Sequence, residues 1–283
     1  MAIGFSKKMQ ELAYKNLYGT YYSLDHKNKI SKKIINKFLV YKLNIYIYVI
    51  NKFRRIIRKF LPEDKDLNES INIETNIAIH SEKIKKSINE NGYVFLENFI
   101  SNDFYIYLKN NYPKIYHFEK VKKPQKNFDI GFKYKSDIDS PEYYLESSTC
   151  LKHLYKFINS KKFQVEINKI FFDDTIKLFN YSIIASYAKK GSFLIPHKDS
   201  KYSETKDMSL NFIYFIDGND DNIKFSGGTS FFKDNNLKET LLRPTTLKNS
   251  LLIYDNVKNF YHGFEVMKKN CFRKAITFTF YRY

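Results

Sequence analysis

Residues 187–199 read Y-A-K-K-G-S-F-L-I-P-H-K-D, in which a short apolar run, residues 193–196, leads to a histidine and an aspartate. Side chains alternate along a strand, so His197 and Asp199 point toward the same face if this run is a strand. His262, near the end of the chain, offers a second imidazole. Two imidazoles and one carboxylate on one side of a cation form the facial triad of non-haem Fe(II) centres. We therefore predict a metal site made of these three residues, although an isolated H-x-D is more often a polar surface pair.

Arg273 lies in the last apolar run, residues 272–281, which reads F-R-K-A-I-T-F-T-F-Y. The bulky apolar side chains of this run alternate with the position of Arg273, which places the arginine on the opposite face. A charge that faces the inside of a barrel needs a partner of opposite sign. The planar guanidinium is suited to bidentate binding of a carboxylate. We predict that Arg273 binds an anionic ligand; a charge at a strand edge is the alternative.

Short apolar and aromatic runs with turns between them follow one another through the C-terminal part of the chain. Such a succession is typical of a double-stranded β-helix, a jelly roll whose two sheets enclose a pocket. We predict a mainly β fold with flanking helices (α+β), with a jelly-roll core at about 178–283 preceded by N-terminal helices. The predicted strands are 178–187, 193–199, 208–216, 228–232, 238–243, 249–254, 260–267 and 272–281.

The order of these motifs resembles the Fe(II)/2-oxoglutarate-dependent dioxygenases, in particular their prolyl-hydroxylase-like branch. In that family a Tyr and a Gly precede H-x-D, an aromatic strand and a Gly-Gly hairpin follow it, and an apolar strand leads to H-G and an Arg strand. The resemblance covers roughly the last two hundred residues. The corresponding features here are Tyr187, Gly191, residues 210–217, 227–232 and 250–255, His262-Gly263 and Arg273.

The resemblance implies that the predicted triad holds Fe(II) and that Arg273 holds the distal carboxylate of 2-oxoglutarate. It also implies that Tyr187 and Thr277 help to bind this carboxylate. For Tyr187 simple packing is an equal alternative, because the chain has 24 tyrosines. O2 is then the second co-substrate, and ascorbate is a further candidate cofactor. The implied reaction hydroxylates an unactivated carbon, with succinate and CO2 as co-products.

Two departures from the family pattern concern the co-substrate end of the pocket. Members of this branch often have a Tyr where this chain has Phe215, and an Arg-x-Ser pattern of other members reads Arg273-Lys274-Ala275 here. A hydroxyl is therefore missing from the expected contacts of the co-substrate. Asp199 favours hydroxylation, because halogenating relatives have a small residue at this position.

The net charge is +18, and residues 1–61 contribute +12 of it with eleven Lys and three Arg. The remainder has little of the positive charge that phosphate contacts need, so we expect no nucleic-acid partner. The two cysteines, Cys150 and Cys271, lack metal-type spacing. They exclude a disulfide framework and favour a reducing cytoplasm.

We divide the chain into 1–75, a basic, largely helical region with a linker from residue 62, and 76–283, the oxygenase domain. Residues 30–61 contain no Gly or Pro, which predicts one long helix or two joined ones. The longest apolar run in it is too short to cross a bilayer. Two interpretations stay open. The helix contacts anionic phospholipids peripherally at the inner membrane face, or it packs on the domain and turns a Lys face to solvent.

Between the N-terminal region and the jelly roll, the pattern predicts helices and one strand. Residues 117–146 are charged and aromatic, and we predict an irregular segment that covers the substrate. The other expected elements are a helix at 79–91 ending at Gly92, a strand at 92–101, a helix at 103–111 and a helical pair at 150–172.

Three functions remain open. The first is a hydroxylase of a small-molecule or glycan-type substrate, including lipid-linked intermediates. The second is a peptidyl-prolyl hydroxylase, suggested by the resemblance alone. The third, from another class, is a non-catalytic jelly-roll binding protein with a vestigial metal site.

Overall fold

The computed structural model describes residues 29–60, 72–123, 126–135, 148–171, 178–199, 209–233, 239–255, 258 and 260–282. Residues 1–28 and most of the predicted linker, residues 61–71, lie outside this description. The division of the chain at residue 75 stays a prediction.

All eight strands expected in the C-terminal part are present, and three more precede them. The hydrogen-bonded order is β1-β9-β6-β11-β4-β3-β5-β10-β7-β8, with β2 paired to β3. Every pairing between these strands is antiparallel. The strands are β1 (Tyr93–Glu97), β2 (Glu119–Lys123), β3 (Lys126–Lys135), β4 (Leu178–Lys189), β5 (Phe193–His197), β6 (Ser209–Gly218), β7 (Ser230–Phe232), β8 (Thr240–Leu242), β9 (Ser250–Asp255), β10 (Tyr261–Phe264) and β11 (Phe272–Arg282).

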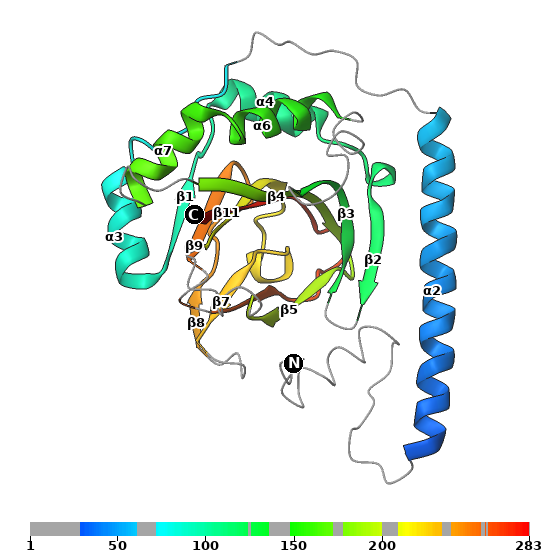
Figure 1. Cartoon of the computed structure of the whole chain (residues 1–283). Helices are drawn as coiled ribbons and strands as arrows, with labels where there is room; N and C mark the ends of the chain where they lie inside the picture. Colours follow the sequence, from blue (N-terminus) through cyan, green and yellow to red (C-terminus); the bar gives the residue numbers. More distant parts are fainter. Residues whose placement is uncertain are drawn as a thin grey trace.

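The strand order folds back on itself to form a barrel (Figure 1). On one side β3 joins the two sheets, because it pairs with both β4 and β5. On the other side β1 meets β8, where the hydroxyl of Tyr93 donates to the carbonyl of Leu241 at 3.0 Å. The Tyr93 ring also packs edge-on against Phe231 of β7. These contacts produce the double-stranded β-helix that the strand pattern predicted.

Four helices cover the outer face of the larger sheet (Figure 1). Their apolar side chains and the outward-facing aromatics of β6 and β11 form one buried cluster, in which Phe163 packs against Phe278 and Phe280. This layer leaves the opposite face of the sheet for the barrel interior. The helices are α3 (Ser81–Asn91), α4 (Asn102–Asn111), α6 (Thr149–Ile158) and α7 (Lys161–Phe171), with short 3-10 turns η1 (Ile115–His117) and η2 (Ile223–Phe225) elsewhere.

The prediction of an irregular segment at 117–146 was wrong for its first half. Strands β2 and β3 form a hairpin there, and β3 contributes to both sheets. Apolar residues do alternate along 126–135, but the positions between them hold Asp129, Gly131 and Lys133. One of these, Asp129, is buried because a distant helix covers it. Residues 136–147 lie outside the described part of the chain.

That helix is α2 (Lys29–Phe60), one continuous helix as the absence of Gly and Pro predicted. Its C-terminal half packs on η1 and β2 through polar contacts. Arg54 forms an ion pair of 2.6 Å with Asp129 and donates to the carbonyl of Phe118 at 3.0 Å. Asn51 bonds to both backbone groups of Lys120. The interpretation that this helix packs on the domain is therefore confirmed for this half.

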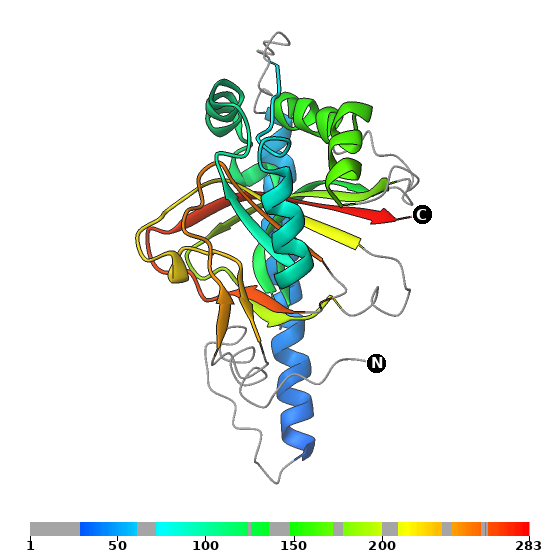
Figure 2. The same cartoon turned by 90° about the vertical axis from the view of Figure 1, so that its left-hand side faces the viewer.

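The N-terminal part of α2 projects past the strands (Figure 2). Within the described residues, no helix combines the length and apolar character needed to span a bilayer.

Candidate metal centre

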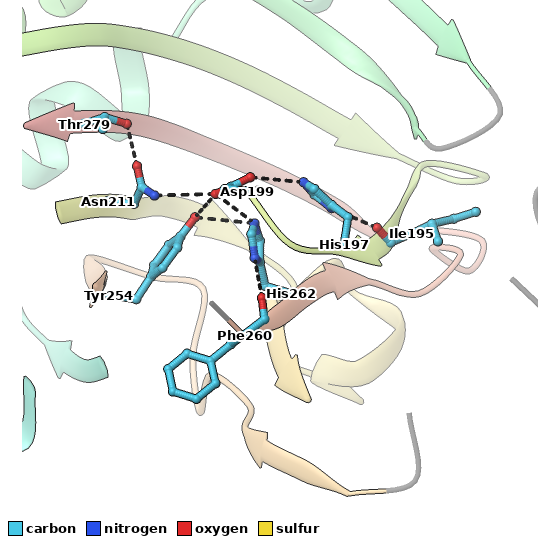
Figure 3. Close-up of polar contacts among 8 residues, drawn as sticks. All are labelled: Ile195, His197, Asp199, Asn211, Tyr254, Phe260, His262 and Thr279. Carbon is cyan, nitrogen blue, oxygen red and sulfur yellow. Dashed lines mark hydrogen bonds and ion pairs between the residues drawn. The ribbon is translucent and has the colours of Figure 1, made fainter. Parts of the chain in front are cut away.

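The three residues of the predicted triad come together inside the barrel (Figure 3). His197 ends β5, Asp199 follows it, and His262 lies in β10. One potential ligand atom from each lies within 4.8 Å of the other two. The imidazoles are partners in the β5–β10 ladder, and their ring centroids are 4.5 Å apart. The sequence spacing alone could not show this convergence, since it depends on the pairing of two strands.

A β-bulge in β5 turns His197 toward the interior. The ladder pairs His262 with His197 but Phe264 with Leu194, so β5 has one more residue than β10 between these pairs. Leu194 and Phe264 pack together inside the barrel. Leu194 and His197 are three positions apart, so regular alternation would place them on opposite faces; the bulge brings both side chains to the interior.

The glycine of the H-G motif makes room for this bulge. A Cβ at Gly263 would collide with the carbonyl oxygen of Leu194 and with the backbone of Pro196. Any side chain there would push β5 away from β10. The glycine after His262 is thus required by the close approach of the bulged strand.

Both imidazoles are oriented for metal binding through Nε2. Nδ1 of His197 lies 3.0 Å from the carbonyl of Ile195, and Nδ1 of His262 lies 3.3 Å from the carbonyl of Phe260. A carbonyl oxygen accepts but cannot donate, so these contacts favour the proton on Nδ1 and leave a lone pair on Nε2. Each Nε2 faces Asp199 at 3.4 Å, one toward Oδ1 and the other toward Oδ2.

The carboxylate between the imidazoles is held in its ionised form. Burial raises the pKa of Asp199, but the nearby His262 and His197 outweigh it and hold this pKa well below its usual range. Burial lowers the pKa of His262. Burial also acts to lower the pKa of His197, but its hydrogen bond to Asp199 reverses the effect and leaves this pKa raised. The centre therefore combines a fixed negative charge with one imidazole that resists protonation.

Sequence reasoning missed a chain of hydrogen bonds that supports Asp199 (Figure 3). The Tyr254 hydroxyl donates to Oδ2 at 3.2 Å, and Asn211 Nδ2 lies 3.5 Å from the same oxygen. Thr279 in turn donates to the Asn211 side-chain carbonyl at 2.6 Å. Asn211 and Tyr254 are direct partners in the β6–β9 ladder. Polar residues at inward-facing positions of otherwise apolar strands are the signal that could have identified this chain.

Arg273 is buried inside the same barrel. It lies on the same face of β11 as Thr279, because they are six positions apart in a strand whose side chains alternate. Its guanidinium donates to the Gly227 carbonyl at 2.9 Å and to Oγ1 of Thr229 at 3.2 Å. Nε has no hydrogen-bond partner. Among the residues that the structure describes, no carboxylate lies within ion-pair distance of this guanidinium.

Two aromatic rings flank the arginine. The guanidinium carbon lies 5.0 Å from the ring centre of Phe215 and 4.8 Å from that of Phe264. Burial in this apolar setting lowers the pKa of Arg273 to about 10. A buried guanidinium with an unpartnered N–H is a site prepared for an anion. Phe215, the position where a family hydroxyl is absent, is thus in direct contact with Arg273.

Tyr187 and Thr277 lie on opposite faces of the larger sheet. Tyr187 packs against the helix-covered cluster and lies 6.1 Å from the ring of Phe118, centre to centre. Its ladder partner is Lys274, whereas the partner of Arg273 is Ala188. The structure therefore does not bring Tyr187 to the interior.

Thr277 occupies the interior face of β11, between Arg273 and Thr279. Of the two residues expected to assist Arg273, only Thr277 shares its side of the sheet.

The fold is similar to those of known oxygenases at low sequence identity. A prolyl hydroxylase from Trichoplax adhaerens, in complex with a peptide fragment of the hypoxia inducible factor oxygen degradation domain, superposes with a TM-score of 0.54 and 13% identity, over 73% of this chain and 90% of that chain. A 2OG-Fe(II) oxygenase family oxidoreductase from Burkholderia pseudomallei superposes with a TM-score of 0.51 and 11% identity, over 71% of this chain and 90% of that chain. No family model and no curated protein matches the sequence. The predicted fold resemblance to the 2-oxoglutarate oxygenases is confirmed.

Proposed function

We propose that this protein is an Fe(II)- and 2-oxoglutarate-dependent dioxygenase that hydroxylates an unactivated carbon. One observation carries the proposal. Two imidazoles with inward Nε2 atoms, one ionised carboxylate and a buried arginine that lacks an acidic partner among the described residues all face one barrel interior. A triad alone fits several divalent metals, but the adjacent anion site fits a metal-bound dicarboxylate co-substrate.

Each group has a definite role. His197, Asp199 and His262 would hold Fe(II) on one side and leave the other side for ligands. When bound, the metal and 2-oxoglutarate supply the oxidising power from O2, with succinate and CO2 as co-products. Buried aromatic and aliphatic side chains line the strands around this interior, whereas the side chains of His197 and Asp199 are 33% and 31% exposed, which leaves this side of the centre open to a substrate.

Arg273 would bind the distal carboxylate of 2-oxoglutarate. Thr229 supports this binding, because a hydroxyl that accepts from the arginine keeps its own hydrogen for a second acceptor. Thr229 is buried, so that acceptor has to be a protein group or a ligand. This hydroxyl can replace the one that Phe215 lacks. Thr277, on the same face of β11, remains a further candidate contact.

The test combines co-substrate binding with turnover. Purified protein, Fe(II) and 2-oxoglutarate are expected to yield succinate under air but not under nitrogen. We expect Arg273→Lys to raise the KM for 2-oxoglutarate roughly tenfold or more, because a point charge cannot reproduce the planar fork. Tyr187→Phe, on the other face of the sheet, is the matched control and should leave this KM unchanged.

Measurements of metal binding and succinate formation distinguish an active dioxygenase from a non-catalytic protein with a vestigial metal site. His262→Ala is expected to abolish both succinate formation and tight binding of Mn(II), a redox-silent substitute for Fe(II). A wild-type protein that forms no succinate and binds 2-oxoglutarate equally with and without metal would refute the proposal. In that case the non-catalytic jelly-roll binding protein would be the better description.

For the substrate, we propose a small molecule or a glycan-type intermediate. A peptidyl-prolyl hydroxylase is the second candidate, and its support is the Trichoplax adhaerens neighbour, a prolyl hydroxylase in complex with a peptide. Incubation with proline-rich peptides and with glycan substrates distinguishes the two. Mass spectrometry should detect the gain of one oxygen atom in the glycan substrates only. A gain in the peptides would favour the peptidyl-prolyl hydroxylase.

A further inference from the structure

One side of α2 exposes a continuous apolar stripe. Its members recur every three or four positions, which places them along one face of the helix. Phe53 is 62% exposed and Phe60 is 79% exposed. Apolar side chains gathered on one exposed face mark an interaction site more often than chance exposure does. The stripe consists of Ile45, Val49, Phe53, Ile56 and Phe60.

The stripe is exposed although α2 is bound to the domain, because the contacts with the domain lie on the other side of the helix. The opposite side of α2 is fixed to the domain through Asn51 and through the ion pair of Arg54 with Asp129. Half-buried apolar residues of α2, such as Ile47 and Ile50, also turn away from the stripe. The helix thus satisfies its contacts with the domain and still presents a second apolar face to the outside.

The charge of α2 identifies the kind of surface that fits this face. Its sequence contains seven Lys and three Arg but no Asp or Glu. Lys42 and Lys52 are exposed beside the stripe, and the Lys52 ammonium lies 5.9 Å from the ring centre of Tyr48. Apolar residues flanked by basic residues are typical of helices that lie in the interface of an anionic bilayer.

A second copy of the chain fits this face poorly. Pairing two α2 helices along their stripes would bring the exposed Lys42 and Lys52 of each helix close to those of the other, and neither helix has an acidic residue to compensate. Like charges held side by side destabilise such a pairing. Anionic headgroups would instead neutralise the same charges.

We propose that the outward stripe of α2 docks the domain on an anionic membrane surface. The helix would lie in the plane of the interface, with Phe53, Ile56 and Phe60 inserted at the boundary of the acyl chains. Because Arg54 and Asn51 hold α2 to the barrel, binding of the helix also fixes the domain against the membrane. This inference is independent of the metal centre.

Vesicle sedimentation of the full chain tests the proposal. Vesicles of equal parts phosphatidylglycerol and phosphatidylcholine should bind the protein, whereas pure phosphatidylcholine should bind it at least tenfold more weakly. The triple variant Val49→Ser, Phe53→Ser, Phe60→Ser is expected to weaken binding to anionic vesicles about tenfold or more. The matched control is Ile79→Ser with Ile106→Ser, two exposed apolar residues outside α2, which should bind like wild type.

A fluorescence measurement locates the contact without removing the stripe. The chain has no tryptophan, so Phe53→Trp introduces a single reporter. Its emission should shift to shorter wavelength with anionic vesicles and be quenched by brominated acyl chains. Ile79→Trp should show neither change.

Three results would overturn the proposal. They are equal binding by the triple variant and the wild type, equal binding to both lipid compositions, and a Phe53→Trp emission unchanged by vesicles. A stable dimer in light scattering that the triple variant dissociates would assign the stripe to a second copy instead. Circular dichroism of each variant shows whether α2 and the barrel remain folded.

Discussion

The hydroxyl of Tyr254 donates to Oδ2 of Asp199 across 3.2 Å, and the same oxygen lies 3.4 Å from Nε2 of His262. Burial raises the pKa of Tyr254 well above its usual value, so the phenol stays protonated and remains a donor. Asn211 contacts the same carboxylate oxygen from β6. The orientation of the Asp199 carboxylate is thus set by two residues, Tyr254 and Asn211, that are not proposed metal ligands.

Tyr254→Phe is expected to weaken metal binding about tenfold, because removal of an outer hydrogen bond lets the ligand carboxylate rotate. The ring, which packs edge-on against Phe231, is retained. Titration of the metal-free protein with Co(II) or Mn(II) measures the change. Tyr93→Phe is the control: it removes a hydroxyl from the contact between β1 and β8 and should leave metal affinity as in wild type. Equal affinity of the Tyr254 variant and wild type would contradict a positioning role.

Metal affinity should also depend on the protonation of His197. Its pKa is raised above the ordinary value of about 6.5. Metal binding requires the unprotonated Nε2, so a proton competes with the metal as pH falls through this raised pKa. We expect Mn(II) affinity to be constant at higher pH and to fall with decreasing pH, by up to about tenfold per unit for one released proton. An affinity that stays flat from pH 8 to pH 5 would show that no imidazole of the triad titrates against the metal.

The strands and the triad could be predicted because their signals are local or ordered along the chain. Apolar runs between turns marked all eight C-terminal strands. The motif order brought His197 and His262 into one hypothesis. The position of Arg273 on the face away from the bulky apolar residues followed from alternation alone, and the structure places it there.

The remaining features depend on contacts between distant segments, and the sequence does not show which segments meet. Tyr187 was expected near the co-substrate, but the ladder pairs it with Lys274, and a shift of one position separates it from Arg273. Strand β3 was missed because its charged residue Asp129 is buried in an ion pair with Arg54 of α2, which is 75 positions away in the sequence. Cross-strand register and contacts between distant segments, not residue type, decide these cases.

Gly263→Ala tests whether the bulge of β5 is needed for the metal centre. The added Cβ would meet the backbone of Leu194 and Pro196, so β5 has to move away from β10 and His197 moves with it. We expect metal affinity to fall about tenfold or more, since ligand geometry must be held closely. The control is Gly191→Asn, where an added Cβ meets nothing within 4 Å and Asn tolerates the positive φ. Metal affinity that is normal in Gly263→Ala would mean that the two strands can separate without displacing the ligands.

Arg54→Met tests whether α2 is energetically part of the domain. The Asp129 side chain is fully buried and that of Arg54 is 11% exposed, so the substitution leaves a buried carboxylate without its counter-charge. Loss of one partner from a buried pair costs about 3–5 kcal/mol of unfolding free energy. Arg55→Met is the matched control, because the pair of Arg55 with Glu119 is exposed and worth less than about 1 kcal/mol.

Urea unfolding followed by far-UV circular dichroism gives both values. A large decrease in unfolding free energy for Arg54→Met and a small decrease for Arg55→Met would establish that α2 stabilises the barrel through Asp129. Replacing both partners, as Arg54→Met with Asp129→Leu, should recover much of the loss, because no unpaired charge then remains buried. A urea midpoint of Arg54→Met equal to that of wild type would instead mean that the Arg54–Asp129 pair adds nothing to the stability of the barrel.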